Sequence, residues 1–191
     1  MTRAAAIIWA WATSIILVWV FVAVDLGQPL WMRQHSLDLT AYGAFEGRTL
    51  TPGDSWKLLA SQWLHVKFPH MLFNVAVIGL VGAALTRRLA WPLVLALGLV
   101  GGAFGQLAAA LLQPGAYMSG ASQAYLALCG TALLSLDRKG IGWWTAVVGV
   151  AVSVGLDLFV SDHAAIKPGH LVSFGAGLAV GCAVLLSTRR R

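Results

Sequence analysis

The segment HVKFPHMLFNVAVIGL, residues 65–80, places two histidines and an asparagine at the start of a run that is otherwise apolar. The run from residue 69 to residue 86 is long enough to form a helix that spans a membrane. Strongly polar side chains are costly at membrane depth, so they usually face the interior of a helix bundle or a water-filled cavity and mark function. His65, His70 and Asn74 are therefore candidate functional residues.

The whole chain has the composition of an integral membrane protein. It has 191 residues, of which 59% are hydrophobic and 10% are charged, and its mean hydropathy is +0.78. Apolar runs separated by glycine, proline and charged residues predict an all-α bundle of six membrane-spanning helices, in one domain that covers residues 1–191. The expected spans are 4–24, 69–86, 90–112, 121–136, 142–160 and 169–187.

The first apolar run has a signal peptide as its alternative interpretation, because Arg3 precedes it. The run is longer than the apolar region of about 7 to 15 residues that is typical of a signal peptide. No small-residue cleavage motif follows in DLGQPLWMRQ, residues 25–34. We therefore expect a retained helix.

The charges predict the orientation of the chain. Six helices place both termini on one side, which carries one acid, Asp137, and a set of bases: Arg3, Arg87, Arg88, Arg138, Lys139 and Arg189 to Arg191. The other acids fall on the opposite side: Asp25, Asp38, Glu46, Asp54, Asp157 and Asp162. By the positive-inside rule we expect both termini in the cytoplasm. The expected membrane is a bacterial cytoplasmic (inner) membrane.

The chain has a net charge of +6, but its basic residues form no stripe interleaved with exposed aromatic residues. Nucleic acid is therefore not an expected partner.

The one long connection, roughly residues 25–68, lies on the external side. Within it, residues 55–65 have an apolar pattern that predicts a short amphipathic helix in the headgroup layer. The apolar face would consist of Trp56, Leu59, Trp63 and Leu64.

Two further polar residues begin spans at the same external level. Ser122 follows the glycine-rich stretch QPGAYMSGA, residues 113–121, and opens a short helix. His170 begins the last span, in which Ser173, Gly177 and Gly181 form a small-residue stripe on the same face. Such a stripe allows close approach of another helix, so Ser122 and His170 can meet if these two helices pack together.

Serine becomes a nucleophile when a base takes its proton, and histidine is the usual base near neutral pH. Amide hydrolysis also needs hydrogen-bond donors for the developing oxyanion. His70, Asn74 and the Ser122 backbone N–H are the candidate donors, and this chemistry explains the polar residues of the opening segment.

Other interpretations of these residues exist. A serine at a helix start often only caps the helix. A histidine at a membrane interface often only places its apolar ring body and polar tip there, and an asparagine in a span often only makes a hydrogen bond between helices. A metal site is the rival chemistry, and Asp162 and His163 would be nearby, but no carboxylate completes a zinc-binding motif with His65 and His70. We expect no metal.

Cys129 and Cys182 lie in apolar runs, where we expect thiols that pack as small hydrophobes.

At these positions the chain resembles the rhomboid family of intramembrane serine proteases. HVKFPHMLFN fits the family's H-x-x-x-x-H-x-x-x-N motif, and GASQAYLALCG, residues 120–130, fits G-x-S-G-x-x-x-A-x-x-G through Gly120 and Ser122. GHLVSFGAG, residues 169–177, fits the motif of the final helix through His170.

The resemblance implies a six-helix rhomboid fold with a partly embedded first external loop. It also implies a dyad of Ser122 and His170 without an aspartate, an oxyanion hole from His70, Asn74 and the Ser122 N–H, and no cofactor. His65, Gly120 and Gln123 would support the site. The implied substrates are transmembrane or membrane-adjacent segments of other proteins, which reach a site open to the external side from the lipid bilayer.

The chain departs from the family pattern at three positions. Gln123 replaces the glycine after the serine, Leu126 stands where many members have tyrosine, and Ser173 replaces a glycine. We expect the Gln123 side chain to face the cleft, with a place in the helix packing as the alternative. A catalytically inactive relative that binds transmembrane clients, and a rhombosortase-like protease that trims C-terminal membrane anchors, stay open as other functions.

Overall fold

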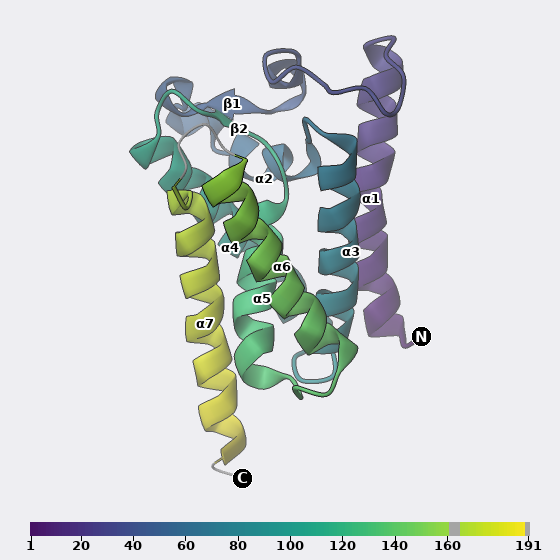
Figure 1. Ribbon diagram of the computed structural model, residues 1–191, viewed down its shortest axis with the longest axis vertical. Coiled ribbons are helices and arrows are strands. Elements are labelled where there is room, and N and C mark those ends of the chain that lie inside the picture. Colours follow the sequence, from purple (N-terminus) through teal and green to yellow (C-terminus); the bar gives the residue numbers. More distant parts are fainter. Residues whose placement is uncertain (161–164, 190–191) are drawn as a thin grey trace.

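Long helices make up most of the structure (Figure 1). The computed structural model describes residues 1–160 and 165–189. The long helices are α1 (Arg3–Asp25), α3 (Phe68–Leu85), α4 (Trp91–Leu112), α5 (Ser122–Ser135), α6 (Ile141–Phe159) and α7 (Pro168–Arg189). Each begins and ends within two residues of its expected span, so the prediction of an all-α membrane bundle is confirmed.

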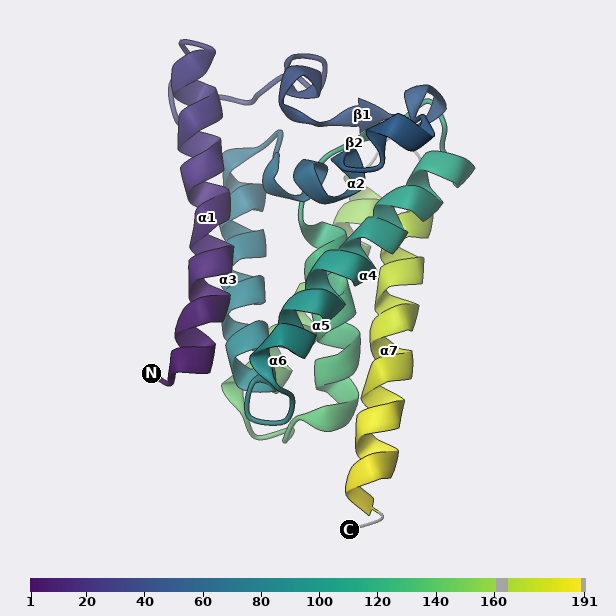
Figure 2. The ribbon, with the colours of Figure 1, turned by 180° about the vertical axis from the view of Figure 1, so that it is seen from behind.

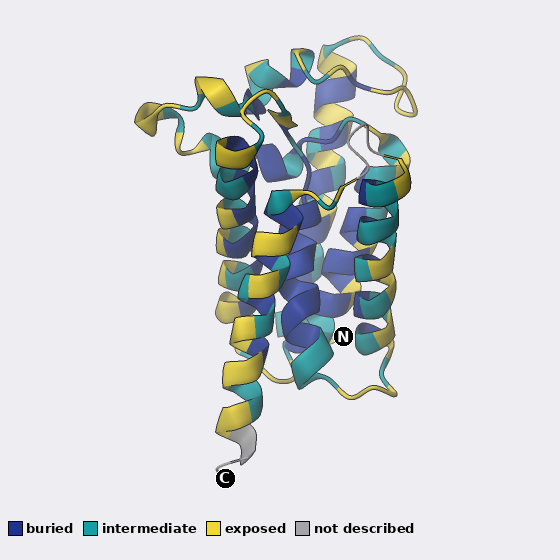
Figure 3. Cartoon of the chain, turned by 60° about the vertical axis from the view of Figure 1, so that its left-hand side comes forward, coloured by how far each residue is buried: buried dark blue, intermediate teal, exposed yellow. Residues whose placement is uncertain are grey.

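Five of these helices, all except α5, are long and apolar enough to cross a membrane. Helix α5 has 14 residues, which corresponds to about 21 Å at 1.5 Å per residue. It packs against α3, α4, α6 and α7, and its residues 122–132 are all buried. Figure 3 shows this buried interior as a column inside the bundle. The short helix is thus enclosed by the longer ones.

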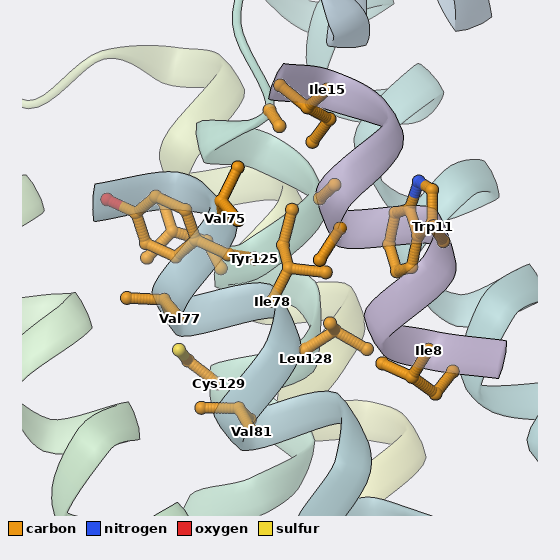
Figure 4. Close-up of a cluster of buried hydrophobic side chains, with 14 of the residues drawn as sticks. Ile8, Trp11, Ile15, Val75, Val77, Ile78, Val81, Tyr125, Leu128 and Cys129 are labelled. Atoms are coloured by element: carbon orange, nitrogen blue, oxygen red, sulfur yellow. The ribbon is translucent and has the colours of Figure 1, made fainter. Parts of the chain in front are cut away.

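A hydrophobic cluster joins α1 and α3 to the central helix α5 (Figure 4). Its members recur every three or four residues along each helix, so they share one face. They include Ile8, Trp11, Ile15, Val75, Ile78, Val81, Tyr125 and Leu128. Cys129 is buried in the same cluster as a free thiol, in agreement with the expected packing role. Cys182 is also free and is exposed on the protein surface.

Helices α5 and α7 approach closely through their small residues. A Cβ atom added to Gly177 of α7 would lie 2.1 Å from the carbonyl oxygen of Ala127 on α5, a distance that no side chain tolerates. The Thr131 hydroxyl donates a hydrogen bond across the same contact to the Gly177 carbonyl at 2.8 Å. The expected small-residue stripe therefore does bring another helix against the face of α7 that carries His170.

The long connection between α1 and α3 does not contain the single amphipathic helix expected over residues 55–65. It has a four-residue helix, α2 (Lys57–Ala60), followed by one 3-10 turn, Ser61–Trp63. Leu64 then adopts extended backbone angles and is buried, whereas Trp56 and Leu59 are exposed. Leu64 does not share a face with the other three apolar residues, because the helical segment ends before it and is shorter than expected. Further 3-10 turns span Asp38–Tyr42, Gly47–Thr49 and Pro52–Asp54.

A two-stranded antiparallel sheet, which the sequence did not predict, ties this connection to the segment before α5. Strand β1 (Phe45–Glu46) pairs with β2 (Tyr117–Met118). The pair lies at the end of the bundle where α3, α5 and α7 begin, while α1 begins and α7 ends at the opposite end (Figures 1 and 2). The sheet thereby fixes the chain only a few residues before Ser122.

Candidate active site

Ser122 and His170 meet inside the bundle, although 48 positions separate them in the sequence. Ser122 is the first residue of α5 and His170 lies in the first turn of α7. His170 Nε2 lies 2.9 Å from Ser122 Oγ, and both residues are buried. At this distance the hydroxyl donates a hydrogen bond to an unprotonated Nε2, the geometry that a nucleophile and its base require.

The two residues before Ser122 are held by three separate elements. Gly120 has φ +109, in the left-handed region that favours glycine. Its N–H donates to the Ser61 carbonyl at 2.9 Å, and its carbonyl accepts from Gln106 Nε2 on α4 at 3.2 Å. The Ala121 N–H donates to His65 Nε2 at 3.2 Å. The position of the serine is thus fixed by the loop, by α4 and by His65 together.

His65 is a buried hydrogen-bond acceptor. Its Nε2 accepts from the Ala121 N–H and lies 2.8 Å from Asn74 Nδ2. Because Nε2 accepts, the proton of the neutral ring resides on Nδ1, which faces the Trp63 carbonyl at 3.4 Å. Burial lowers the pKa of His65 to about 3, and the nearby His70 ring adds to this effect. His65 therefore stays neutral and supports the site structurally.

The two expected side-chain donors of the oxyanion hole lie close to the serine loop. Asn74 is fully buried on α3 and bonds to His65. His70 is half-buried, with Nε2 4.0 Å from the place that a Cβ atom on Gly120 would occupy. His70, Asn74 and the Ser122 N–H thus lie at one corner of the bundle. Among the hydrogen bonds of the described residues, none joins Asn74 to Ser122.

Gln123 lies in the helix packing and not in an open cleft. Its side chain is buried, and its Cγ lies 2.7 Å from the place of a Cβ atom on Gly105, so the glycine of α4 makes room for it. Its Oε1 lies 3.0 Å from Ser122 Oγ. The expectation of a cleft-facing side chain was wrong, because α4 presents a glycine where the amide can be buried.

Gly105 also accommodates another of the three departures, Ser173. The Ser173 hydroxyl is buried and donates to the Gly101 carbonyl of α4 at 2.9 Å. A Cβ atom on Gly105 would come within 2.0 Å of this hydroxyl. The serine therefore joins α7 to α4. At the remaining departure, Leu126 is buried, and the adjacent Tyr125 ring packs edge-on against Phe73 of α3.

Asp157 is a site residue that the sequence reasoning missed. Its Oδ2 lies 2.6 Å from His170 Nδ1, on the side of the ring opposite to Ser122. The resemblance implied a pair of Ser122 and His170 without an aspartate, whereas here a carboxylate lies beside the His170 ring. Asp157 was counted only as an external charge, but the signal was present: it is a carboxylate inside an apolar span, one turn after Ser153.

The described residues contain no group of three or more histidine, cysteine or acidic side chains that could hold a metal ion. Asp162 and His163, which entered the metal hypothesis, lie outside the described residues.

Known proteins resemble this chain over most of the helical bundle. The family model of the Rhomboid domain matches residues 52–187, a range that contains every residue of the site. RHOMBOID-like protein 7 of Arabidopsis thaliana is 28% identical over 149 residues, 73% of this chain and 46% of the relative. Rhomboid-like protease 2 of Toxoplasma gondii is 29% identical over 154 residues, 75% of this chain and 52% of the relative.

Rhomboid protease GluP of Bacillus subtilis is 26% identical over 151 residues, which cover 75% of this chain and 29% of the relative. The chain thus spans about half or less of the length of these relatives. The matched region includes the whole helical bundle from α3 onward. The chain belongs to the rhomboid family.

Proposed function

We propose that the protein is an intramembrane serine endopeptidase, which cleaves transmembrane or membrane-adjacent segments of other membrane proteins within the lipid bilayer. The observation that carries this function is the contact of 2.9 Å between Ser122 Oγ and His170 Nε2, inside a bundle of apolar helices. Two relatives whose names include "protease" support the same class of activity.

In the proposed reaction, Ser122 Oγ attacks the carbonyl carbon of the scissile amide while His170 Nε2 takes the hydroxyl proton. The electron pair of the carbonyl bond moves to its oxygen, which the Ser122 N–H, His70 and Asn74 stabilise. His170 then gives the proton to the departing amine nitrogen as the C–N bond breaks, and an acyl ester stays on Ser122.

A water molecule completes the cycle. His170 takes one of its protons, the hydroxide attacks the ester carbon, and the proton returns to Ser122 Oγ as the ester bond breaks. Asn74 is compatible with its part in both steps, because Nδ2 carries two hydrogens and its bond to His65 uses one.

The same proposal covers the substrate and the orientation. A helical peptide keeps its carbonyls in hydrogen bonds, so the substrate must present an extended segment at Ser122. The Arg-rich end, where α1 begins, would lie in the cytoplasm, and the site, at the end where α5 and α7 begin, would open to the external side. The relatives come from a plant, a parasite and a bacterium, so they do not single out the expected bacterial membrane.

The test is cleavage of a panel of transmembrane substrates by the full chain in liposomes. We expect cleavage by the wild type and none by Ser122→Ala or His170→Ala, and the two losses should not add in the double variant, because the residues act as one unit. Asn74→Ala should retain part of the activity. Full activity of either single alanine variant at Ser122 or His170 would refute the mechanism.

A second function, a catalytically silent protein that binds transmembrane clients, is favoured by one observation. The Gln123 Oε1 atom lies 3.0 Å from Ser122 Oγ, nearly as close as His170 Nε2 at 2.9 Å. It therefore competes for the hydroxyl proton. Retention of clients by a wild-type protein that cleaves no member of the panel would support this function over the protease.

A further inference from the structure

We propose that Asp157 is a positioning residue of the proposed protease site, which holds the His170 ring so that Nε2 faces Ser122 as a proton acceptor. The site is then a triad of Ser122, His170 and Asp157 rather than a dyad. This inference rests on the proposed function, and it adds a residue from α6 to the pair of Ser122 on α5 and His170 on α7.

The contacts on the His170 ring carry the inference. A carboxylate can only accept hydrogen bonds, so the His170 Nδ1 atom, 2.6 Å from Asp157 Oδ2, must carry a proton. The neutral ring then has an unprotonated Nε2, and this is the atom that faces Ser122 Oγ at 2.9 Å. Asp157 thus selects the one tautomer in which His170 can act as a base.

Asp157 is itself held firmly. Its side chain is 1% exposed, its Oδ2 accepts the Lys167 backbone N–H at 3.1 Å, and its Oδ1 lies 3.7 Å from Lys167 Nζ. The Lys167 carbonyl in turn accepts the His170 backbone N–H at 3.0 Å. Lys167 therefore links the carboxylate to the backbone of the histidine, which fixes the ring relative to α6.

The charge matters during the reaction as well as before it. When His170 takes the serine proton, its ring becomes a cation with a carboxylate 2.6 Å away. Hydrogen bonds between such charged partners are about twice as strong as neutral ones. The Ser153 hydroxyl also reaches Nδ1, at 3.2 Å, but it is neutral and cannot replace this stabilisation.

The rival role for Asp157 is purely structural, since the bonds to Lys167 alone would attach the start of α7 to the end of α6. The variant Asp157→Asn separates the two roles. Its amide oxygen, placed where Oδ2 lies, still accepts from the Lys167 N–H and from His170 Nδ1, but the negative charge is gone. If the amide nitrogen takes that place instead, it donates a hydrogen bond to Nδ1. The neutral ring then carries its proton on Nε2 and cannot accept the serine proton there.

We expect Asp157→Asn to lower kcat roughly 10²–10⁴-fold with KM changed less than about threefold, because Asp157 does not touch the substrate. The rate of labelling by a fluorophosphonate should fall in parallel, since that reaction needs an activated serine and no substrate binding. The thermal unfolding midpoint of each variant shows whether it is folded. Asp137→Asn is the matched control, because Asp137 is an exposed carboxylate on the loop at the other end of the bundle, and it should keep the wild-type rates.

The outcomes separate this inference from the proposed function. A reactive wild type and a folded Asp157→Asn with wild-type kcat and labelling rate would overturn the positioning role and leave the protease in place. A wild type that neither cleaves nor reacts would overturn the proposed function itself.

A measurement on the wild type keeps the inference testable if Asp157→Asn does not fold. NMR of ¹⁵N-histidine protein in detergent, with His170 assigned by comparison with His170→Ala, reports which ring nitrogen is protonated in the neutral ring. The proton should reside on Nδ1. A neutral His170 ring protonated on Nε2 would contradict the role of Asp157.

Discussion

At the scale of single residues, the Ser122 hydroxyl has two acceptors, and only one of them is a base. It can donate to His170 Nε2 at 2.9 Å or to Gln123 Oε1 at 3.0 Å. A net hydrogen bond contributes about 0.5–1.5 kcal/mol, which corresponds to a change of up to about tenfold in the population of the reactive hydroxyl rotamer. In the proposed mechanism, the amide therefore lowers the reactivity of the serine without abolishing it.

The first prediction concerns Gln123→Met, which keeps the length of the side chain and removes the amide acceptor. The packing against Gly105 of α4 should be retained, while the hydroxyl should turn more often to His170. We expect fluorophosphonate labelling to become up to about tenfold faster with little change in the unfolding midpoint. Gln123→Gly is the comparison, because it should label faster but lose up to about 1 kcal/mol of stability. Slower labelling of Gln123→Met would show that the amide assists the serine instead.

The second prediction concerns His65, whose pKa burial lowers to about 3 from the ordinary value of 6.5. The unfolded chain binds a proton at this residue below about pH 6.5 and the folded chain does not, so stability should fall as the pH drops from 6.5 toward 3, by up to about 1.4 kcal/mol per pH unit. In His65→Gln the amide oxygen can accept from the Ala121 N–H and does not titrate. Its unfolding midpoint should therefore fall less between pH 7 and pH 5 than that of the wild type. Equal falls would contradict the buried, neutral state of His65.

At the scale of helices and strands, the contact of α5 with α7 decides whether the site exists. The hydropathy pattern predicted both helices to within two residues, because apolar length is a local property of the sequence. It did not predict the pairing of β1 with β2, since strands of two residues carry no alternation to detect. It also predicted one longer amphipathic helix where the backbone forms a short helix and a turn, because Leu64 is buried in a cluster with Val22, Leu39 and Ala44, which lie far from it in the sequence.

The third prediction tests this contact through Gly177→Ala. The added methyl group would lie 2.1 Å from the Ala127 carbonyl oxygen, so α7 must move away from α5 or the contact between the two helices must be strained. We expect a loss of about 1–3 kcal/mol in stability and a larger loss of cleavage, because the gap between Ser122 and His170 opens. Gly175→Ala is a matched control two residues away, where a Cβ atom meets nothing within 4 Å, and it should be neutral or slightly stabilising. Equal behaviour of the two variants would contradict the close packing of α5 on α7.

At the scale of the whole molecule, short polar segments from distant parts of the sequence converge at one end of the apolar bundle. The sequence was enough to select four of these residues, Ser122, His170, His70 and Asn74. Polar residues in apolar spans are few, and these four match the family motifs in their order along the chain. Asp157 could not be assigned to His170 in this way, since its contact depends on how the end of α6 faces the start of α7. The side-chain directions of Gln123 and Ser173 were likewise set by Gly105 on α4, more than ten residues away in sequence.

The fourth prediction concerns orientation in the membrane. Helix α1 begins at the end of the bundle where α7 ends, and the Arg-rich loops lie at the same end. By the positive-inside rule, a reporter fused after Lys139 or at the C-terminus should be active if it is a protein that functions in the cytoplasm, and inactive if it functions only outside it. A reporter fused within the loop that contains β1 should behave as external. The opposite pattern would place the site on the cytoplasmic side and contradict the proposed access of substrates.

The most direct test of the central claim, that His170 activates Ser122 as a nucleophile, is fluorophosphonate labelling followed by mass spectrometry of the intact and digested protein. The protein should be in detergent or liposomes, with a soluble serine hydrolase as the positive control for the probe. We predict one added probe mass on the peptide that contains Ser122 in the wild type, no label in Ser122→Ala, and strongly slowed labelling in His170→Ala. A wild type that stays unlabelled while the control hydrolase reacts, or a label that persists in Ser122→Ala, would contradict the claim.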